Sequence, residues 1–303
     1  MASVLGPLAC GGGSGAIAGG VVRVAVAANF ADAHAELAER FAEQTGIAVR
    51  TSVGSTGHLY AQIVNGAPFD VFLAADTASA SRLEAEGLAV PGSRFTYAEG
   101  RLALYAPAIG TWRTAAEGTA GRDTPDPSPP GAALHGLEVL RATADPVTGE
   151  GRLALANPRL APYGMAARQA LVALGLWDAL GERIVMAENI GQAFQFVESG
   201  AAELGLVAGS YVIDRPASAV WPVPADLYAP IRQDAVRLDA AGDSAAARAF
   251  LEYLGSDEAR GVIESRGYGL PRRERDGSPS EDAGAPPPGR PRSAVPSPGG
   301  DSR

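Results

Sequence analysis

The sequence contains no lysine at all. The 25 basic residues of the 303-residue chain are all arginine, 34 residues are acidic, and the formal net charge is −9. The arginines form no basic stripe, which argues against binding to nucleic acid. An acidic protein that binds an anion must rely on local dipoles, because its overall field repels the ligand.

Cysteine and histidine are nearly absent as well. The single cysteine, Cys10, allows no internal disulfide and no cysteine metal cluster. His34 and His135 belong to no metal-ligand spacing, and His58 is expected on the rim of a helix start. We therefore expect no bare metal cation and no cofactor. No run of 18 or more apolar residues occurs, so the sequence predicts no transmembrane helix.

From about residue 21 onward the chain alternates between strand and helix patterns, and 46% of its residues are hydrophobic. This alternation predicts an α/β fold with one or two well-packed cores. Strands or extended segments are expected at residues 22–28, 47–53, 69–76, 100–107, 151–158, 183–189, 204–212 and 221–238. Helices are expected at residues 30–45, from about 57, and at 165–174, 192–199, 245–255 and 257–266.

Three segments do not follow this pattern. Residues 1–20 are a Gly-rich leader in which "LAC", followed by a Gly/Ser tether, is typical of a signal that lipidates Cys10, although the usual basic start of such a signal is missing. A disordered leader or a misplaced start codon stays open as the alternative. Residues 113–150 are rich in Pro, Gly and Asp and predict a flexible surface insertion. Residues 273–303 predict a disordered tail.

Four strand-to-helix junctions share an unusual chemistry. They are "AANF" with Asn29, "VGSTG" with Ser55 and Thr56, "APYG" with Tyr163, and "ENIGQ" with Ile190. Each helix start offers unpaired N–H groups and about half a positive charge, so four of them together would supply roughly two charges. That suits a small dianion held without arginine or lysine. The alternative is that these side chains are ordinary helix caps.

These motifs, together with "PGSRFTYAEGRLALYA" and "YAPIRQDAV", resemble the molybdate-binding proteins of ABC importers, which are periplasmic solute-binding proteins of the type II class. The resemblance runs from about residue 21 to residue 270. It implies a two-lobed α/β fold in which each lobe is a mixed sheet flanked by helices, two crossover strands join the lobes, and molybdate or tungstate lies in the cleft between them. The first lobe would comprise residues 21–103 and 228–272, and the second residues 104–227.

The resemblance also implies a set of oxyanion ligands. They are Ala28, Asn29, Ser55, Thr56, Tyr163 and Ile190. Asn29 is expected both to cap its helix and to donate its amide to the ion, Thr56 to donate its hydroxyl, and Tyr163 and Ile190 to donate backbone N–H groups. One branch of the family has a tyrosine hydroxyl where this chain has Ala208, so that donor is absent here.

The expected ligands favour some oxyanions over others. Molybdate and tungstate only accept hydrogen bonds at neutral pH, whereas hydrogen phosphate also donates one and therefore requires an acceptor in the site. None of the expected ligands is acidic, which argues against phosphate. Sulfate has the same charge and shape as molybdate but is smaller. Its rejection must therefore depend on donors of the site that the smaller ion leaves without a hydrogen bond, each of which costs about 1–3 kcal/mol.

The resemblance implies a monomeric carrier, periplasmic or otherwise extracytoplasmic, that closes by a hinge motion and delivers its ion to a membrane permease. A carrier of sulfate or another tetrahedral oxyanion is one alternative. An enzyme that uses the helix starts as an oxyanion hole on a phosphoester is another, but no nucleophile or general base stands at the four junctions and "GSTG" is no nucleophile elbow. A sensory domain is a third, and no fused DNA-binding or kinase segment supports it.

Several other polar residues have structural explanations. Asp70 and Asp76, in "FDVFLAAD", are expected to bond loop backbone at strand ends, and Arg232 and Asp234 to brace the hinge strands. The tryptophans are expected to pack in the interior. They are Trp112, Trp177 and Trp221.

Overall fold

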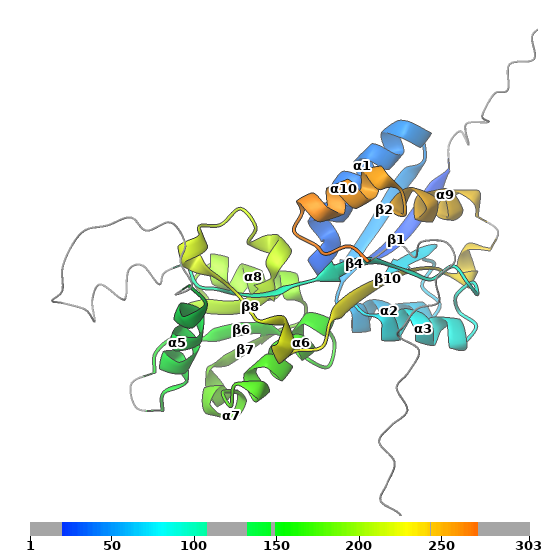
Figure 1. Ribbon diagram of the computed structural model, residues 1–303. Coiled ribbons are helices and arrows are strands. Elements are labelled where there is room, and N and C mark those ends of the chain that lie inside the picture. Colours follow the sequence, from blue (N-terminus) through cyan, green and yellow to red (C-terminus); the bar gives the residue numbers. More distant parts are fainter. Residues whose placement is uncertain (1–19, 108–131, 147–148, 243, 272–303) are drawn as a thin grey trace, which may run out of the picture. The chain divides into compact units, whose positions relative to one another are not determined.

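The structure, a computed structural model, describes residues 20–107, 132–146, 149–242 and 244–271. Within these residues the chain forms two five-stranded mixed sheets, each flanked by helices (Figure 1). This confirms the α/β fold class expected from the sequence. The predicted leader with Cys10 and the predicted tail lie outside the described residues.

The first sheet has the strand order β2-β1-β3-β10-β4. Strands β1, β2 and β3 are parallel, and β10 runs antiparallel to both β3 and β4. The strands are β1 (Val21–Ala27), β2 (Ala48–Gly54), β3 (Val71–Leu73), β4 (Phe95–Gly100) and β10 (Ile231–Arg237). The helices of this lobe are α1 (Ala31–Thr45), α2 (Thr56–Val64), α3 (Thr77–Ala85), α9 (Ala245–Leu254) and α10 (Asp257–Ser265).

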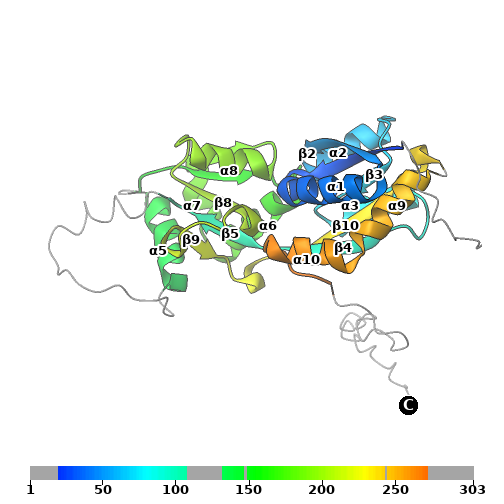
Figure 2. The ribbon, with the colours of Figure 1, turned by 90° about the horizontal axis from the view of Figure 1, so that it is seen from above.

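The central strands β1 and β3 of the first sheet are buried on both faces, which explains why their sequences are nearly continuous apolar runs. In β1, Val24 and Val26 pack toward Phe41 in α1, whereas Ala25 points to the opposite face toward Leu59 in α2. Accordingly, α1, α9 and α10 cover one face of this sheet and α2 and α3 cover the other (Figures 1 and 2). The helix starts that follow β1 and β2 are thereby held at the carboxyl edge of the sheet.

The second sheet has the order β7-β6-β8-β5-β9, with β6 parallel to β7 and β8, and β5 antiparallel to β8 and β9. Its strands are β5 (Leu102–Tyr105), β6 (Leu153–Ala156), β7 (Ile184–Ala187), β8 (Leu204–Ala208) and β9 (Val220–Pro222). Its helices are α5 (Ala132–Ala144), α6 (Pro162–Ala173), α7 (Trp177–Leu180) and α8 (Ile190–Glu198).

Two connections join the sheets. Strand β4 continues into β5 through Arg101 alone, and residues 223–230 lead from β9 back to β10. Since β4 and β10 pair with each other in the first sheet, both connections leave the first lobe side by side. This is the paired crossover that a hinged two-lobed protein requires.

The structure corrects the prediction of a flexible insertion over residues 113–150, because residues 132–144 form α5. Its side chains Val139 and Leu140 are buried in the core of the second lobe. The Pro- and Gly-rich stretch that dominated the sequence pattern ends where this helix begins. Helix α3 and strand β4 are further elements that the strand and helix patterns did not predict. In the described part of the chain no helix has the length and apolar character to cross a bilayer.

Candidate functional site

A small cavity lies where the carboxyl ends of the parallel strands of both lobes face each other. Its volume is about 10 Å³, far less than the roughly 300–1,000 Å³ of a pocket for a drug-sized molecule. All six residues expected as oxyanion ligands line it. Its lining residues are Ala27, Ala28, Asn29, Ser55, Thr56, Ala75, Ala161, Pro162, Tyr163, Asn189 and Ile190. The four junctions, spread over 160 residues of sequence, therefore meet at one place.

At the first junction, the structure corrects the expected role of Asn29. A 3₁₀ turn, η1 (Ala28–Phe30), separates β1 from α1, and neither η1 nor α1 has a side-chain cap. The Asn29 Nδ2 group instead donates to Gln233 Oε1 at 2.8 Å, with a longer contact of 3.5 Å to the Tyr268 hydroxyl. Asn29 is thus buried and fixed by tertiary contacts, not by its helix.

At the second junction, the two hydroxyls are held by different backbone groups. Ser55 is the N-cap of α2, and its Oγ accepts from the backbone N–H of His58 at 3.4 Å. The Thr56 Oγ1 accepts from the backbone N–H of Ala75 at 3.1 Å. Each hydroxyl accepts one bond and keeps its own proton. Both residues line the cavity, so these protons can be donated to a group in it.

At the third junction, α6 begins without any side-chain cap. Pro162, its first residue, has no N–H group, and the N–H of Tyr163 belongs to the first turn, where helices lack internal acceptors. At Gly164, a Cβ would lie 2.2 Å from the carbonyl oxygen of Ala156. Only glycine therefore lets this helix start approach the end of β6 so closely.

At the fourth junction, Asn189 and Gln192 form a reciprocal capping pair. The Asn189 Oδ1 accepts from the N–H of Gln192 at 3.0 Å, and the Gln192 Oε1 accepts from the N–H of Glu188 at 2.7 Å. This arrangement leaves the N–H of Ile190, the first residue of α8, without an intrahelical partner. Ile190 itself is buried and lines the cavity.

The lining contains no charged side chain of either sign. Three α-helices of nine, twelve and nine residues begin at the cavity, so their dipoles contribute at most roughly one and a half positive charges. The first junction opens with the three-residue 3₁₀ turn η1 and adds little. Burial raises the pKa of the Tyr163 phenol well above its ordinary value, so that side chain is neutral as well.

Direct bonds between the two lobes flank the cavity. On one side, the Gly57 N–H at the start of α2 donates to the Leu160 carbonyl at 2.8 Å. On the other side, the Tyr211 hydroxyl, from the turn after β8, donates to the Ala28 carbonyl at 2.5 Å. Ser210 lies 3.0 Å from the hydroxyl of Tyr268. The lobes are thus closed over the cavity in this structure.

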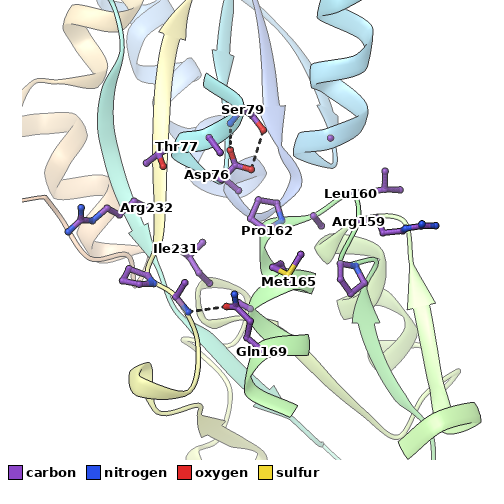
Figure 3. Close-up of a pocket in the computed structure, with 18 residues that line it drawn as sticks. Asp76, Thr77, Ser79, Arg159, Leu160, Pro162, Met165, Gln169, Ile231 and Arg232 are labelled. Carbon is purple, nitrogen blue, oxygen red and sulfur yellow. Dashed lines mark hydrogen bonds between the residues drawn. The ribbon is translucent and has the colours of Figure 1, made fainter. Parts of the chain in front are cut away.

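A wider recess of about 320 Å³ adjoins the small cavity and shares Ala75, Ala161 and Pro162 with it. Figure 3 shows Asp76 and Ser79 on the side of the first lobe and Met165 and Gln169 on the side of the second. Asp76 caps α3 by accepting from the Ser79 N–H at 2.7 Å, and burial raises the pKa of its carboxyl.

The structure shows the partners of the remaining polar residues, and Asp70 and Asp76 bond the backbone of a strand and of a helix, not of loops as expected. The carboxyl of Asp70 accepts from the N–H of Arg23 at 2.7 Å, and Asp76 bonds the backbone of α3. Asp234 in β10 accepts from Arg94 at 2.6 Å and from Thr96 at 2.7 Å. Arg232 lies 3.7 Å from Glu99 across the same strand pair, and His58 is exposed.

Trp221 is buried in the core and Trp177 packs against it, as expected, whereas Trp112 lies outside the described residues. No group of three or more His, Cys, Asp or Glu side chains suited to a metal ion occurs in the described ranges.

Sequence reasoning missed several residues of the site. Ala75 and Ala161 have no side-chain chemistry that could have identified them. Gln233, Tyr211 and Tyr268, which bond the first junction, lie about 180 to 240 residues away from it in sequence. The only signal in the sequence was the motif "YAPIRQDAV", which contains Gln233 and to which no ligand role was assigned.

Comparison with known proteins identifies the family. A family model described as bacterial extracellular solute-binding protein matches residues 22–269. The chain belongs to this family.

Among the relatives of this solute-binding protein are two that are named molybdate-binding protein ModA. The one from Azotobacter vinelandii is 44% identical over 252 residues, which cover 82% of this chain and 90% of the relative. The one from Rhodobacter capsulatus is 39% identical over 251 residues, covering 83% of this chain and 89% of the relative. These relatives confirm the resemblance that the sequence motifs indicated.

A solved structure of the Azotobacter vinelandii periplasmic molybdate-binding protein superimposes on this solute-binding protein with a TM-score of 0.69 and 40% identity, covering 83% of this chain and all of the other. The sulfate-binding protein SubI from Mycobacterium tuberculosis has a TM-score of 0.63 but only 12% identity, with coverages of 83% and 87%. The second likeness shows only that the fold is shared.

Proposed function

We propose that this protein captures molybdate, and tungstate with it, outside the cytoplasm and delivers the ion to an ABC-type permease. The observation that carries the proposal is the convergence of the four junctions on a small cavity with no charged lining. Relatives 44% and 39% identical are named for molybdate binding, and that chemistry fits an uncharged cavity rich in N–H and O–H donors.

The proposed ligands are Ala28, Asn29, Ser55, Thr56, Tyr163 and Ile190. Of the two hydrogens on Asn29 Nδ2, one is bonded to Gln233 and the other makes only the long 3.5 Å contact with the Tyr268 hydroxyl; we assign this second hydrogen to the ion, together with main-chain N–H groups of η1. Ser55 and Thr56 offer hydroxyl protons, and Tyr163 and Ile190 offer backbone N–H groups at helix starts. These donors come from both lobes, so ligand binding stabilises the closed conformation.

The absence of a carboxylate from the lining favours an ion that only accepts hydrogen bonds. Hydrogen phosphate would leave its proton without an acceptor. The same lining offers no general base or activated nucleophile, so the protein acts as a carrier and not as an enzyme. Sulfate is rejected because a smaller ion leaves donors unpaired.

We also propose that the protein works as a monomer, with lobes comprising residues 21–103 with 228–272 and residues 104–227. The strand order of the two sheets supports this division. Attachment to a membrane through a lipidated Cys10 remains a proposal from the sequence.

Calorimetric titration of the full chain with molybdate, tungstate, sulfate and phosphate, at one pH and salt concentration, tests the proposal. We expect tight binding of the first two and none of the last two. Asn29→Ala and Thr56→Ala should each weaken molybdate binding by about tenfold or more, the loss of one hydrogen bond to a charged group. Sulfate binding as tight as molybdate binding would make the protein a general oxyanion carrier, and no heat with any ion would refute the proposal.

A further inference from the structure

Gln233 lies at the centre of the hinge and is completely buried. It occupies β10, the strand through which the chain returns to the first lobe, at the point where the pairing register with β4 shifts between Gln233 and Asp234. A buried amide must have its hydrogen bonds satisfied, since an unpaired polar group costs free energy. The partners of Gln233 are therefore informative.

The two ends of the Gln233 amide contact cavity residues of different lobes. Its Oε1 accepts from Asn29 Nδ2 at 2.8 Å in the first lobe, and from the Tyr97 hydroxyl at 3.0 Å. Its Nε2 lies 3.4 Å from the hydroxyl of Tyr163, whose backbone N–H is in the second lobe. One side chain thus connects two of the four junctions through the hinge.

Gly100 shows that this contact is closely fitted. At Gly100, the last residue of β4, an added Cβ would lie 2.1 Å from the Tyr163 hydroxyl oxygen and 2.9 Å from Gln233 Nε2. The tip of the Tyr163 phenol therefore lies against the hinge backbone, in space that only a glycine leaves free. Tyr163 reaches the hinge with its side chain and the cavity with its main chain.

The acceptor character of Gln233 Oε1 determines which end of the Asn29 amide faces it. An oxygen acceptor requires Nδ2 at that position, so Nδ2 cannot exchange places with Oδ1 without setting two oxygens against each other. An exchanged amide would offer lone pairs, not hydrogens, where Nδ2 now lies. For a dianion in the cavity, that change turns an attractive contact into a repulsive one.

We propose that Gln233 is a positioning residue of the oxyanion site. It fixes the orientation of the Asn29 amide and, through Tyr163, couples that orientation to closure of the second lobe. The inference rests on the proposed function, because it concerns how the same cavity holds its ion.

Gln233→Glu separates a positioning role from a purely structural one, because only a positioning role makes molybdate affinity depend on pH in this variant. The titratable groups facing this position are the phenols of Tyr97 and Tyr163, and burial raises the pKa of both, so they stay neutral. Asp234, the nearest carboxylate along β10, is bonded to Arg94 and Thr96. A buried glutamate in this setting is protonated at low pH and ionised at high pH, and only its ionised form repels a dianion.

The experiment is molybdate titration of the wild type and the variants between about pH 6 and pH 9. For Gln233→Glu, we expect the dissociation constant to rise by about tenfold or more across this range. The dissociation constant of the wild type should not change with pH. The dissociation constant of Gln62→Glu should be equally independent of pH. This variant is the matched control, because it adds the same charge on an exposed face of α2. Gln233→Met, which keeps the volume but removes the amide, should weaken binding about tenfold at every pH, with a faster dissociation rate.

Gly100→Ala supplies an independent test if a Gln233 variant folds poorly by circular dichroism. Its methyl group displaces the Tyr163 phenol, so we expect weaker binding and faster dissociation. If the wild type binds but the Gln233→Glu profile is flat and Gln233→Met and Gly100→Ala bind like the wild type, the inference is overturned while the proposed function stands. If the wild type itself does not bind molybdate, the proposed function fails and the inference fails with it.

Discussion

His34 is a buried ionisable group that serves packing instead of ligand binding. It lies in α1, with its Nε2 2.8 Å from the Thr51 hydroxyl and its ring edge-on to Phe250. Its Nδ1 is buried and has no hydrogen-bond partner among the described residues. Burial lowers the pKa of His34 to about 4. The imidazole is therefore neutral in the folded protein at neutral pH, whereas the unfolded chain protonates near pH 6.5.

This difference predicts a specific loss of stability in mild acid. Between about pH 6.5 and pH 4, His34 is protonated in the unfolded state but neutral in the folded state. The free energy of unfolding therefore decreases as the pH falls through this range, by roughly 3 kcal/mol in total. His34→Gln removes this dependence. Urea unfolding of both proteins at several pH values should show the wild type losing stability more steeply than the variant. Parallel profiles would contradict the assignment.

At the scale of single elements, glycine sets how closely the helix starts at the cavity approach the opposite lobe. At Gly57, in the first turn of α2, a Cβ would lie 3.0 Å from the Leu160 carbonyl oxygen and 3.2 Å from the Leu160 Cα. Both atoms belong to the backbone of the opposite lobe and cannot rotate away. The hydrogen bond between Gly57 and Leu160 therefore depends on the absence of a side chain.

Gly57→Ala should consequently hinder closure without disturbing the fold of either lobe. We expect molybdate affinity to fall about tenfold, with faster dissociation, while the melting temperature of the ligand-free protein is maintained. Gly261→Ala in the interior of α10 is the matched control, since its Cβ would meet nothing within 4 Å. It should raise stability by about 0.5–1 kcal/mol and leave affinity unchanged. Equal affinities for both variants would show that the contact at Gly57 does not limit closure.

At the scale of the whole molecule, the ion and its carrier have charges of the same sign. The chain has a net charge of −9, and no charged side chain lines the cavity to offset it. Long-range repulsion thus opposes the approach of a dianion, while the helix dipoles act only at short range. We therefore expect the net charge to affect association of the ion and the cavity to determine its retention.

Raising the salt concentration should therefore speed molybdate association. Between about 0.05 and 0.5 M sodium chloride, screening weakens the repulsion, and stopped-flow fluorescence should show a rising association rate with a nearly constant dissociation rate. Potassium chloride should give the same result. An association rate that falls with salt would indicate that Arg159 and Arg232, exposed at the wider recess, steer the ion and outweigh the net charge.

The sequence by itself determined the features that depend on neighbouring residues. Alternating strand and helix patterns predicted the α/β fold, because apolar periodicity reports local burial. The chemistry of the junctions predicted which residues line the cavity, because helix starts carry unpaired N–H groups wherever they occur. The prediction from composition was wrong at residues 132–144. The Pro- and Gly-rich stretch before α5 led to the prediction of a flexible insertion, but these residues form a helix whose Val139 and Leu140 are buried.

The tertiary structure decided what each of those residues does. Asn29 was expected to cap its helix, yet its amide is directed by Gln233 and its carbonyl accepts from Tyr268, partners 204 and 239 residues away. Likewise, the Tyr211 hydroxyl reaches Ala28 only because the two lobes close. Hydrogen bonds of this kind depend on distances set by folding, and no local pattern in the chain encodes them. The sequence therefore predicted which residues line the cavity, and packing across the hinge determined their orientation.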